Sequence, residues 1–389
     1  MYIKSLIYED QSTDWKLELI EFKPLTLLVG VSGVGKTQIL KALLNLKEIS
    51  HGKSLNGLKW EFEFTTSSGD DCKWRGAFEN QGFVSEFYSE FLLKMILDSG
   101  NEKYKPSIDY EQLFINHKLV VDRDREGIKF ENSKTVKLSQ KESAISLLKE
   151  EEQIKKIYDD FTKIIFDDNR NNSSSFGKFD FDDEIELKLN KYKSLSDIRS
   201  SEENIKIKLC LLYKNQNELF KEITANFTDI FPYIQDIKIE PLKSMNNAFG
   251  TFIQRYPFIQ FKEKNVSHWI EESKMSSGIL RTLMHIAELY LCADHTVILI
   301  DEFENSLGIN CINQVTQSIL ESGRNLQFII TSHHPYIIND MNFSHWKIVT
   351  RKGSIVTAID AEKFGIGKSK HQAFTQLANL TAYSEGIDS

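Results

Sequence analysis

The run GVSGVGKT at residues 30–37 constrains this chain more than any other part of its sequence, because it fits the pattern GxxxxGK[ST] of a phosphate-binding loop, the Walker A motif. A short apolar run, LTLLV at 25–29, precedes it and is typical of a strand buried on both faces of a sheet. Apolar residues at helical spacing follow it over 36–46. The sequence therefore predicts the strand, loop and helix that such a motif requires.

This loop has the chemistry needed to hold a nucleoside triphosphate. Its glycines let the backbone curl so that N–H groups point inward at phosphate oxygens, and the helix that follows presents its positive N-terminal end to the same anion. Lys36 is expected to reach the β- and γ-phosphates, and the Thr37 hydroxyl is expected to bind Mg²⁺. We therefore expect ATP and Mg²⁺ as cofactors, held by Gly30, Ser32, Gly33, Gly35, Lys36 and Thr37.

A second, acidic motif lies late in the chain, where the apolar run VILI at 297–300 ends in Asp301 and Glu302. A buried strand delivers such acids to the carboxyl edge of a sheet, which is where ligands bind in open α/β folds. Asp301 is expected to hold Mg²⁺ through water, as a Walker B aspartate does, and Glu302 to orient and deprotonate the attacking water. The long separation of the two motifs disfavours a ring-forming AAA+ ATPase.

Three other places are weaker candidates for the same site. Ser276, Ser277 and Gly278 open a helix shortly before the acidic strand and form either a second anion site or an ordinary helix cap. His333, in the run TSHHP, either contacts the γ-phosphate or belongs to a plain surface loop. Gln140 lies between a strand-like segment and an expected helix, where it either binds Mg²⁺ and the attacking water or is an exposed polar residue.

The hydrophobic pattern predicts an α/β fold. Buried strands alternate with helices in the parts that carry the motifs, which indicates a parallel sheet covered on both faces. The expected strands are 2–8, 15–22, 25–29, 58–64, 72–78, short segments over 118–138, strand-like alternation over 235–262, and 296–300 and 327–331.

Between these strands, charged helical segments at 141–165 and 184–226 flank a polar stretch at 167–183. They indicate either a protruding helical arm or a helical subdomain packed on the core. We expect three parts, namely an N-terminal ATPase lobe over 1–140 with the phosphate loop, a helical insertion over 141–230, and a C-terminal ATPase lobe over 231–389 with the acidic strand.

Composition excludes some functions. The net charge is −8, whereas proteins that bind DNA non-specifically need an excess of Lys and Arg, so composition gives DNA binding no support. The four cysteines, Cys72, Cys210, Cys292 and Cys311, form no CxxC pair, which disfavours zinc and favours reduced core residues in a cytoplasmic protein. Neither a signal peptide nor an apolar run of about 20 residues is present, so we expect no membrane partner.

The order of the motifs resembles that of the ABC-type ATPase superfamily. Within it the chain is similar to the SMC/RecF-like group and, more closely, to the OLD (overcoming lysogenization defect) ATPases of prokaryotic anti-phage defence. The resemblance implies an α/β P-loop NTPase of the ABC-head type, with a mixed central sheet, an antiparallel N-terminal lobe and a helical insertion. The residues that carry it are GVSGVGKT at 30–37, MSSGILR at 275–281, ILIDEFEN at 298–305 and TSHHP at 331–335.

The resemblance also implies a homo-oligomer in which ATP is sandwiched between two heads, with Ser276 and Gly278 acting on the nucleotide of the other subunit. Asn305 would lie in the D-loop that crosses this interface. The signature departs from the family pattern because it reads SSG-Ile rather than SGG-Gln, and Leu307 is followed by Gly308 where many relatives have His. Too few residues follow position 350 for the TOPRIM nuclease domain of OLD nucleases, so nuclease or toxin chemistry would reside in a separate partner.

These features predict an ATP-binding and ATP-hydrolysing subunit of a bacterial anti-phage defence complex. Head association driven by ATP would sense a trigger, either a phage protein or DNA, and control an effector such as a TOPRIM nuclease or a toxin. The alternative is a DNA-repair or chromosome-associated ATPase of the RecF/SMC kind. A nucleotide-gated scaffold without turnover is disfavoured by the intact Asp301–Glu302 pair, and a transporter subunit by the long insertion.

Overall fold

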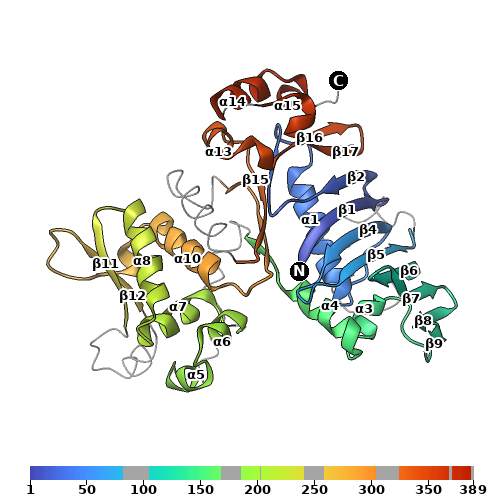
Figure 1. Ribbon diagram of the computed structural model, residues 1–389, viewed down its shortest axis with the longest axis horizontal. Helices are drawn as coiled ribbons and strands as arrows, with labels where there is room; N and C mark the ends of the chain where they lie inside the picture. Colours follow the sequence, from blue (N-terminus) through green and yellow to red (C-terminus); the bar gives the residue numbers. More distant parts are fainter. Residues whose placement is uncertain are drawn as a thin grey trace, which may run out of the picture. The chain divides into compact units, whose positions relative to one another are not determined.

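The computed structural model divides into two compact units, which we call the sheet unit and the helical unit (Figure 1). The sheet unit comprises Met1–Asp167, His295–Glu302 and Leu326–Ser389, and the helical unit comprises Asp168–Asp294 and Phe303–Asn325. The residues that the structure describes are 1–81, 105–167, 185–201, 203–240, 258–303, 324–367 and 370–386.

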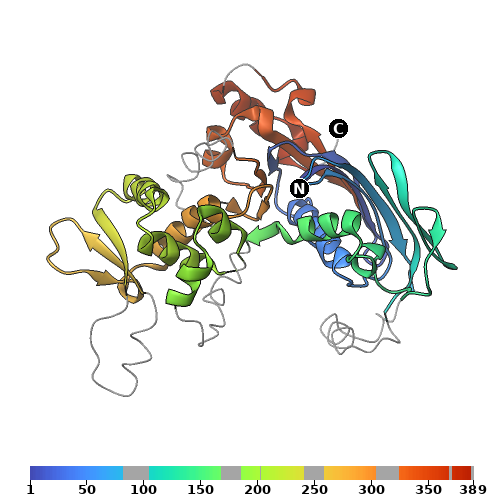
Figure 2. The ribbon, with the colours of Figure 1, turned by 60° about the horizontal axis from the view of Figure 1, so that its bottom comes forward.

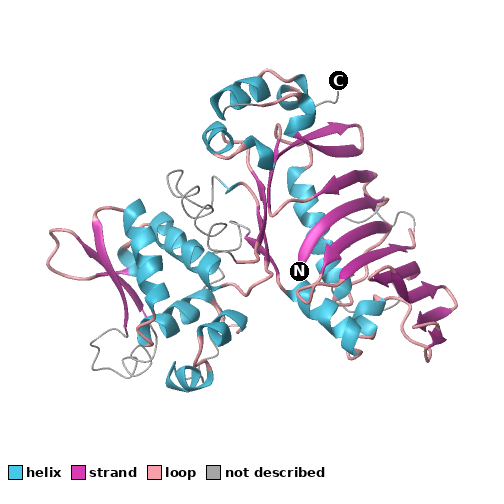
Figure 3. Cartoon of the chain, in the orientation of Figure 1, coloured by secondary structure: helices cyan, strands magenta, loops and turns pink. Residues whose placement is uncertain are grey.

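A single mixed sheet forms the framework of the sheet unit (Figure 3), and the described residues supply 14 strands to it. In spatial order these are β10 (Ile164–Asp167), β14 (Val297–Ile300), β15 (Gln327–Thr331), β3 (Leu25–Val29), β16 (Trp346–Lys352), β17 (Ile355–Asp360), β2 (Trp15–Glu21), β1 (Tyr2–Asp10), β4 (Leu58–Thr65), β5 (Asp71–Phe78), β6 (Ile108–Ile115), β7 (Lys118–Asp124), β8 (Gly127–Phe130) and β9 (Ser133–Lys134).

Parallel pairing at one end of this sheet joins strands from distant parts of the sequence. β3 lies between β15 and β16, and β14 and β10 follow beyond β15, all in parallel. The runs of β3, β14 and β15 are buried along their whole length, as their apolar sequences predict. Because parallel strands end at the same edge, the segments after Val29, Ile300 and Thr331 emerge side by side.

The other end of the sheet is an antiparallel meander whose inner face is covered by helices α1 (Lys36–Ser50), α3 (Ala144–Leu147) and α4 (Glu152–Thr162), as Figure 2 shows. Phe161 of α4 packs against Phe62, Phe64 and Trp74, with ring centroids 6.0, 5.6 and 5.4 Å away. Aromatic burial of this extent fixes α4 on the sheet.

This packing places the start of the second unit later than the sequence predicts. The predicted insertion begins at residue 141, but α3, α4 and β10 belong to the sheet unit, and β10 pairs with β14. The physical reason is the amphipathic pattern of α4, which buries Ile154, Ile157 and Phe161 and so needs a core to pack on. The helical unit begins at Asp168 and extends past residue 230 to Asp294.

The helical unit contains α-helices and a small sheet. Ser194, Asn204, Asn217 and Ser276 cap four of its helices by accepting backbone N–H groups, which accounts for where these helices begin. The predicted helices over 184–226 and the predicted helix start near Ser276 are confirmed. The elements are α5 (Ile185–Lys191), α6 (Leu195–Ser200), α7 (Ile205–Lys214), α8 (Glu218–Ile230), β11 (Ile234–Glu240), β12 (Phe258–Glu263), β13 (Ile270–Glu271), η2 (Glu272–Lys274) and α10 (Ser277–Leu291).

The remaining elements of the sheet unit follow β15 in the sequence. They are α13 (Pro335–Asp340), η3 (Phe343–His345), η4 (Ala361–Phe364), α14 (Lys370–Ala378) and α15 (Thr381–Ser384). α13 begins at Pro335, a residue type that suits the first position of a helix. Residues 168–183 of the polar stretch lie outside the described residues.

The cysteines behave as predicted where the structure describes them. Cys72, Cys210 and Cys292 are buried free thiols, and Cys311 lies outside the described residues. Burial raises the pKa of Cys72 to about 12 and those of Cys210 and Cys292 to about 11, so the reactive thiolates are not populated near neutrality. Within the described ranges, no cluster of metal-ligating side chains and no helix able to cross a membrane is found.

Gln327, at the start of β15, is a buried amide that connects β15 to Ile3 of β1. Its Oε1 accepts the N–H of Ile3 at 2.8 Å, and its Nε2 donates to the carbonyl of Ile3 at 2.8 Å. Gln327→Leu leaves both backbone groups without these partners, so we expect the free energy of unfolding to fall by about 2 kcal/mol in urea denaturation. Gln153→Leu, on the exposed face of α4, is the control, and equal losses in the two variants would contradict this role.

Candidate functional site

The phosphate loop joins β3 to α1, as the sequence predicts (Figure 1). Gly30, Gly33 and Gly35 have φ angles of 153°, 89° and 108°, which side chains disfavour. At Gly30 an added Cβ would lie 2.6 Å from the carbonyl oxygen of Val349 on β16. The loop therefore packs too closely on its neighbouring strand for any other residue at that position.

Positive charge is concentrated inside this loop. The Lys36 ammonium group donates hydrogen bonds to the carbonyl oxygens of Gly30 at 2.7 Å and Val31 at 2.9 Å, so the side chain folds back across the loop. Gly35 is the N-cap of α1 and has no side chain with which to cap it. The first N–H groups of α1 are thus free of a side-chain cap and suit an anion such as phosphate. Ser32 and Gly33 are exposed at the tip of the loop.

The two motifs that are distant in the sequence meet at Asp301. The Thr37 hydroxyl donates to Asp301 Oδ1 at 3.0 Å, and the Thr331 hydroxyl donates to the same oxygen at 2.7 Å. The parallel register explains this meeting, because β14 and β3 both adjoin β15. The hydroxyl and the carboxylate supply the oxygen ligands that Mg²⁺ prefers, so these residues fit a magnesium ion.

Glu302 has an unusual backbone for a glutamate. Its φ angle is 49°, in the left-handed region that only Gly, Asn and Asp visit readily. Its N–H donates to the Thr331 hydroxyl at 2.8 Å, which holds the backbone in this conformation. Strained residues of this kind cluster at functional sites, where neighbouring structure over-determines them.

Thr331 is a site residue that the sequence reasoning did not single out. It is 1% exposed, and its one hydroxyl joins Asp301 to the backbone of Glu302. The available signal was its position, because it ends a buried strand that is parallel to the acidic strand. The end of β10 was also missed: Asp167 is in register with Ile300, the residue before Asp301.

His333 follows Thr331 at the same sheet edge and is exposed to solvent. Ser332 before it is buried, and its hydroxyl accepts the N–H of His334 at 3.1 Å, which turns the chain into α13. This arrangement leaves His333 at the edge where the phosphate loop and Asp301 meet, as its predicted role requires.

Gln140 occupies a different part of the sheet unit. Its exposed side-chain amide donates to the backbone carbonyl of Arg125 at 2.9 Å. Its backbone carbonyl accepts the N–H of Ile108 on β6. Seven strands lie between β3 and β7 in the sheet order. The strand next to β14, which carries the acidic motif, is β10, and β10 is also the last strand before the helical unit. The strand-to-helix junction beside the acidic motif is therefore at the end of β10 and not at Gln140.

The signature residues lie in the first turn of α10 in the helical unit. Ser276 is the N-cap, and its Oγ accepts the N–H of Ile279 at 3.4 Å. Ser276, Ser277 and Gly278 are all exposed, and a Cβ at Gly278 would meet no atom within 4 Å. The turn is therefore an ordinary helix cap whose residues are accessible from solvent. Asn305 lies outside the described residues.

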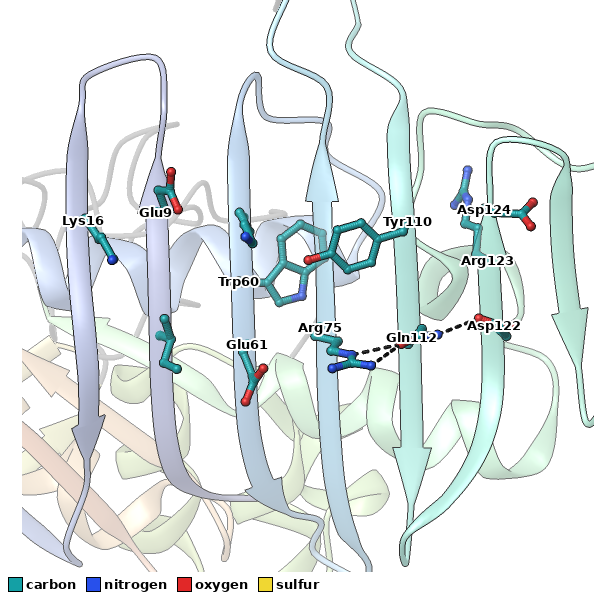
Figure 4. A pocket seen from close by; sticks show the side chains of 12 residues that line it. Glu9, Lys16, Trp60, Glu61, Arg75, Tyr110, Gln112, Asp122, Arg123 and Asp124 are labelled. Atoms are coloured by element: carbon teal, nitrogen blue, oxygen red, sulfur yellow. Dashed lines mark hydrogen bonds between the residues drawn. The ribbon is translucent and has the colours of Figure 1, made fainter.

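A hollow in the described structure lies elsewhere, on the solvent face of the antiparallel strands (Figure 4). It has a volume of about 670 Å³ and is crossed by a row of polar side chains. Arg75 donates to Gln112 Oε1 at 2.9 and 2.7 Å, and Gln112 donates to Asp122 at 2.8 Å. Because these groups bond to one another, the hollow is better explained as a hydrogen-bonded sheet surface than as a ligand site.

A comparison with known protein families decides the class of this molecule. Residues 25–339 match the family described as "AAA domain, putative AbiEii toxin, Type IV TA system". The chain belongs to this family. The match extends from β3 to α13, so it includes the phosphate loop, the signature turn, Asp301, Glu302 and His333.

Comparisons with individual proteins give less information about this chain than the family match does. A search of curated proteins gave no match. Among solved structures the chain is similar to "SmcHead bound to the C-winged helix domain of ScpA", with 15% identity, 92% of this chain and 97% of that chain covered, and a TM-score of 0.49. The SMC head domain from Thermotoga maritima has 12% identity, 92% and 99% coverage and a TM-score of 0.43. The Smc head with an extended coiled coil, bound to the C-terminal domain of ScpA derived from Pyrococcus furiosus, has 14% identity, 94% and 98% coverage and a TM-score of 0.42.

Family and geometry together confirm the fold class predicted from the sequence. The chain is an AAA-family P-loop ATPase with a mixed central sheet and an antiparallel N-terminal lobe. The feature that the sequence reasoning called a helical insertion is the helical unit, which also contains the three-stranded sheet β11–β12–β13.

Proposed function

We propose that this protein hydrolyses ATP, and that ATP-driven association of two copies of its head controls a separate effector in a bacterial anti-phage defence complex. The observation that carries the first part is the convergence of Thr37 and Asp301, joined by a hydrogen bond of 3.0 Å across the sheet edge. Two motifs that are far apart in the sequence meet there in the arrangement that a nucleotide and a metal ion need.

The chemistry follows from these residues. Lys36 and the N-terminal N–H groups of α1 neutralise the phosphate oxygens. Thr37 and Asp301 would hold Mg²⁺, which when bound draws charge from the phosphoryl oxygens. Glu302 accepts a proton from the attacking water. His333 contacts the γ-phosphate, so that its presence is coupled to the conformation of the protein. The water oxygen bonds to the γ-phosphorus as the bond from that phosphorus to the bridging oxygen breaks, leaving ADP and phosphate.

The proposed association rests on the exposed signature turn. Ser276, Ser277 and Gly278 lie exposed at the N-terminus of α10, which suits the γ-phosphate held by a second copy. Asn305 would lie at the same interface. Closure gains γ-phosphate contacts that hydrolysis removes, so the nucleotide acts as a switch.

The defence role is supported by the family description, which names a toxin of a type IV toxin–antitoxin system. We infer a separate effector, a TOPRIM nuclease or a toxin, that responds to head association. The test is twofold: the purified protein should hydrolyse ATP and change from monomer to dimer with ATP and Mg²⁺ in light scattering, and cells that carry the gene with its neighbours should resist phage. Hydrolysis stimulated by duplex DNA without phage resistance would instead favour a DNA-repair ATPase.

Thr331→Val tests the metal arrangement. The substitution keeps the volume of the side chain but removes the donor to Asp301 and the acceptor of the Glu302 N–H. We expect the Mg²⁺ concentration for half-maximal hydrolysis to rise about tenfold, since groups that orient metal ligands contribute at this level. Thr26→Val is the matched control, because Thr26 is buried at the opposite end of β3 and bonds to Lys23. An unchanged magnesium requirement for Thr331→Val would contradict the assignment.

A further inference from the structure

The last described turn of the chain lies directly against the phosphate loop. Gly386 is buried, and an added Cβ at this position would lie 2.6 Å from Val34 Cγ1 and 2.8 Å from Val31 Cγ2. Both distances are shorter than a carbon–carbon van der Waals contact. The loop and the backbone of Gly386 are therefore in contact with no space for a side chain between them.

This turn is anchored to the same strands that support the loop. The Gly386 carbonyl accepts the N–H of Arg351 on β16 at 2.7 Å. Before it, α15 packs on β16, as Figure 1 shows, and Ala382 is 4% exposed. Burial also raises the pKa of Tyr383. The segment Thr381–Gly386 is thus a packed part of the sheet unit.

The β16–β17 hairpin supports the loop at its two ends. The Val349 carbonyl of β16 lies against Gly30, and Val356 of β17 lies within 3.0 Å of a Cβ placed on Gly35. Gly386 supplies the missing contact between these points, against Val31 and Val34. A loop supported at both ends and in the middle has its N–H groups fixed before a phosphate arrives, which lowers the entropic cost of binding.

We infer that the segment Thr381–Gly386 is a positioning element of the nucleotide site, which holds the phosphate loop in the shape that binds ATP. Displacing the segment releases Val31 and Val34, loosens the loop and lowers ATP affinity. The identity of the ligand rests on the proposed function, whereas the positioning of the loop does not.

Gly386→Ala tests this inference, and Gly365→Ala is its matched control. Both glycines have a φ angle of 72°, so alanine brings the same backbone strain to each position. A Cβ at Gly365 meets nothing within 4 Å, whereas at Gly386 it overlaps Val34 and Val31. The difference between the two variants therefore isolates the contact with the loop.

Two measurements decide the outcome. Amide hydrogen exchange of residues 30–37, without nucleotide, should accelerate about tenfold in Gly386→Ala and stay at the wild-type rate in Gly365→Ala. The dissociation constant of a fluorescent ATP analogue should rise about tenfold in Gly386→Ala alone. Adding Val34→Ala to Gly386→Ala removes the overlapping methyl groups and should recover part of both effects.

Equal exchange in the two glycine variants would overturn the inference, and so would wild-type ATP affinity in Gly386→Ala. A wild-type protein that binds no ATP would instead refute the proposed function, and the exchange measurement would still decide whether Thr381–Gly386 positions the loop.

Discussion

Glu302→Gln is expected to lower the rate of ATP hydrolysis by about 10²- to 10³-fold while ATP still binds, because the amide cannot accept the proton of the attacking water. Glutamine has the same shape as glutamate and keeps the backbone N–H that bonds to Thr331. It also bears the same strain at a φ angle of 49°, so the fold and the binding site persist. The bound ATP should therefore accumulate and hold two heads together.

Single-turnover experiments measure the rate of ATP hydrolysis, and light scattering with ATP measures the association of two heads. Glu362→Gln, an exposed glutamate in η4 of the same unit, is the control for charge and should leave both unchanged. Hydrolysis at the wild-type rate in Glu302→Gln would remove Glu302 from the mechanism. Loss of ATP binding would show that this carboxylate acts on the nucleotide itself rather than on the water.

Arg123→Met is expected to lower the free energy of unfolding by about 3–5 kcal/mol, because it leaves a buried carboxylate without its positive partner. Arg123 is 2% exposed and Glu111 is 0% exposed, with Arg123 Nη1 3.5 Å from Glu111 Oε2. The guanidinium also donates to the carbonyl of Ser139 at 2.8 Å. Burial lowers the pKa of Arg123, and the Glu111 carboxylate opposes that effect.

Urea denaturation measures this loss, and Arg125→Met is the matched control. Arg125 lies two residues further along the chain and pairs with Asp109, but its side chain is 78% exposed, so its removal should leave stability unchanged. Adding Glu111→Gln to Arg123→Met removes the orphaned charge and keeps an amide oxygen that can accept from Trp74 and Ser143, so it should recover part of the loss. A single variant as stable as the wild type would show that the hydrogen bonds from Trp74, Ser143 and the Ala144 N–H are enough to stabilise the buried Glu111 carboxylate.

The sequence predicted the parts of the site that follow from local pattern. LTLLV and VILI were recognisable as buried strands because they are short runs without a charged residue, and the structure has them as β3 and β14. The glycine run and the acids at strand ends placed Lys36 and Asp301. Thr331 could not be found in this way, because its role depends on the order β14-β15-β3, which no local pattern encodes.

The choice of Gln140 and the strands that were not predicted have one physical origin, which is pairing between distant segments. Gln140 was chosen as the last residue before a charged helical segment, but that segment packs on the sheet through Ile157 and Phe161. The strand that pairs with the acidic strand, β10, is only four residues long, and its residues were divided between the predicted helical segment at 141–165 and the polar stretch at 167–183. β6 and β16 were missed because the apolar alternation of β6 is interrupted and β16 follows the last motif. Tertiary pairing decided each of these cases.

The position of β3 between β15 and β16 has a consequence for synthesis of the protein. A ribosome adds roughly 5–20 residues per second, so the roughly 300 residues between Val29 and Gln327 take on the order of 15–60 s to translate. During that time both edges of an apolar strand lack their partners, and open edges of this kind recruit other chains. The edges of β3 in the nascent polypeptide therefore stay open until translation is nearly complete.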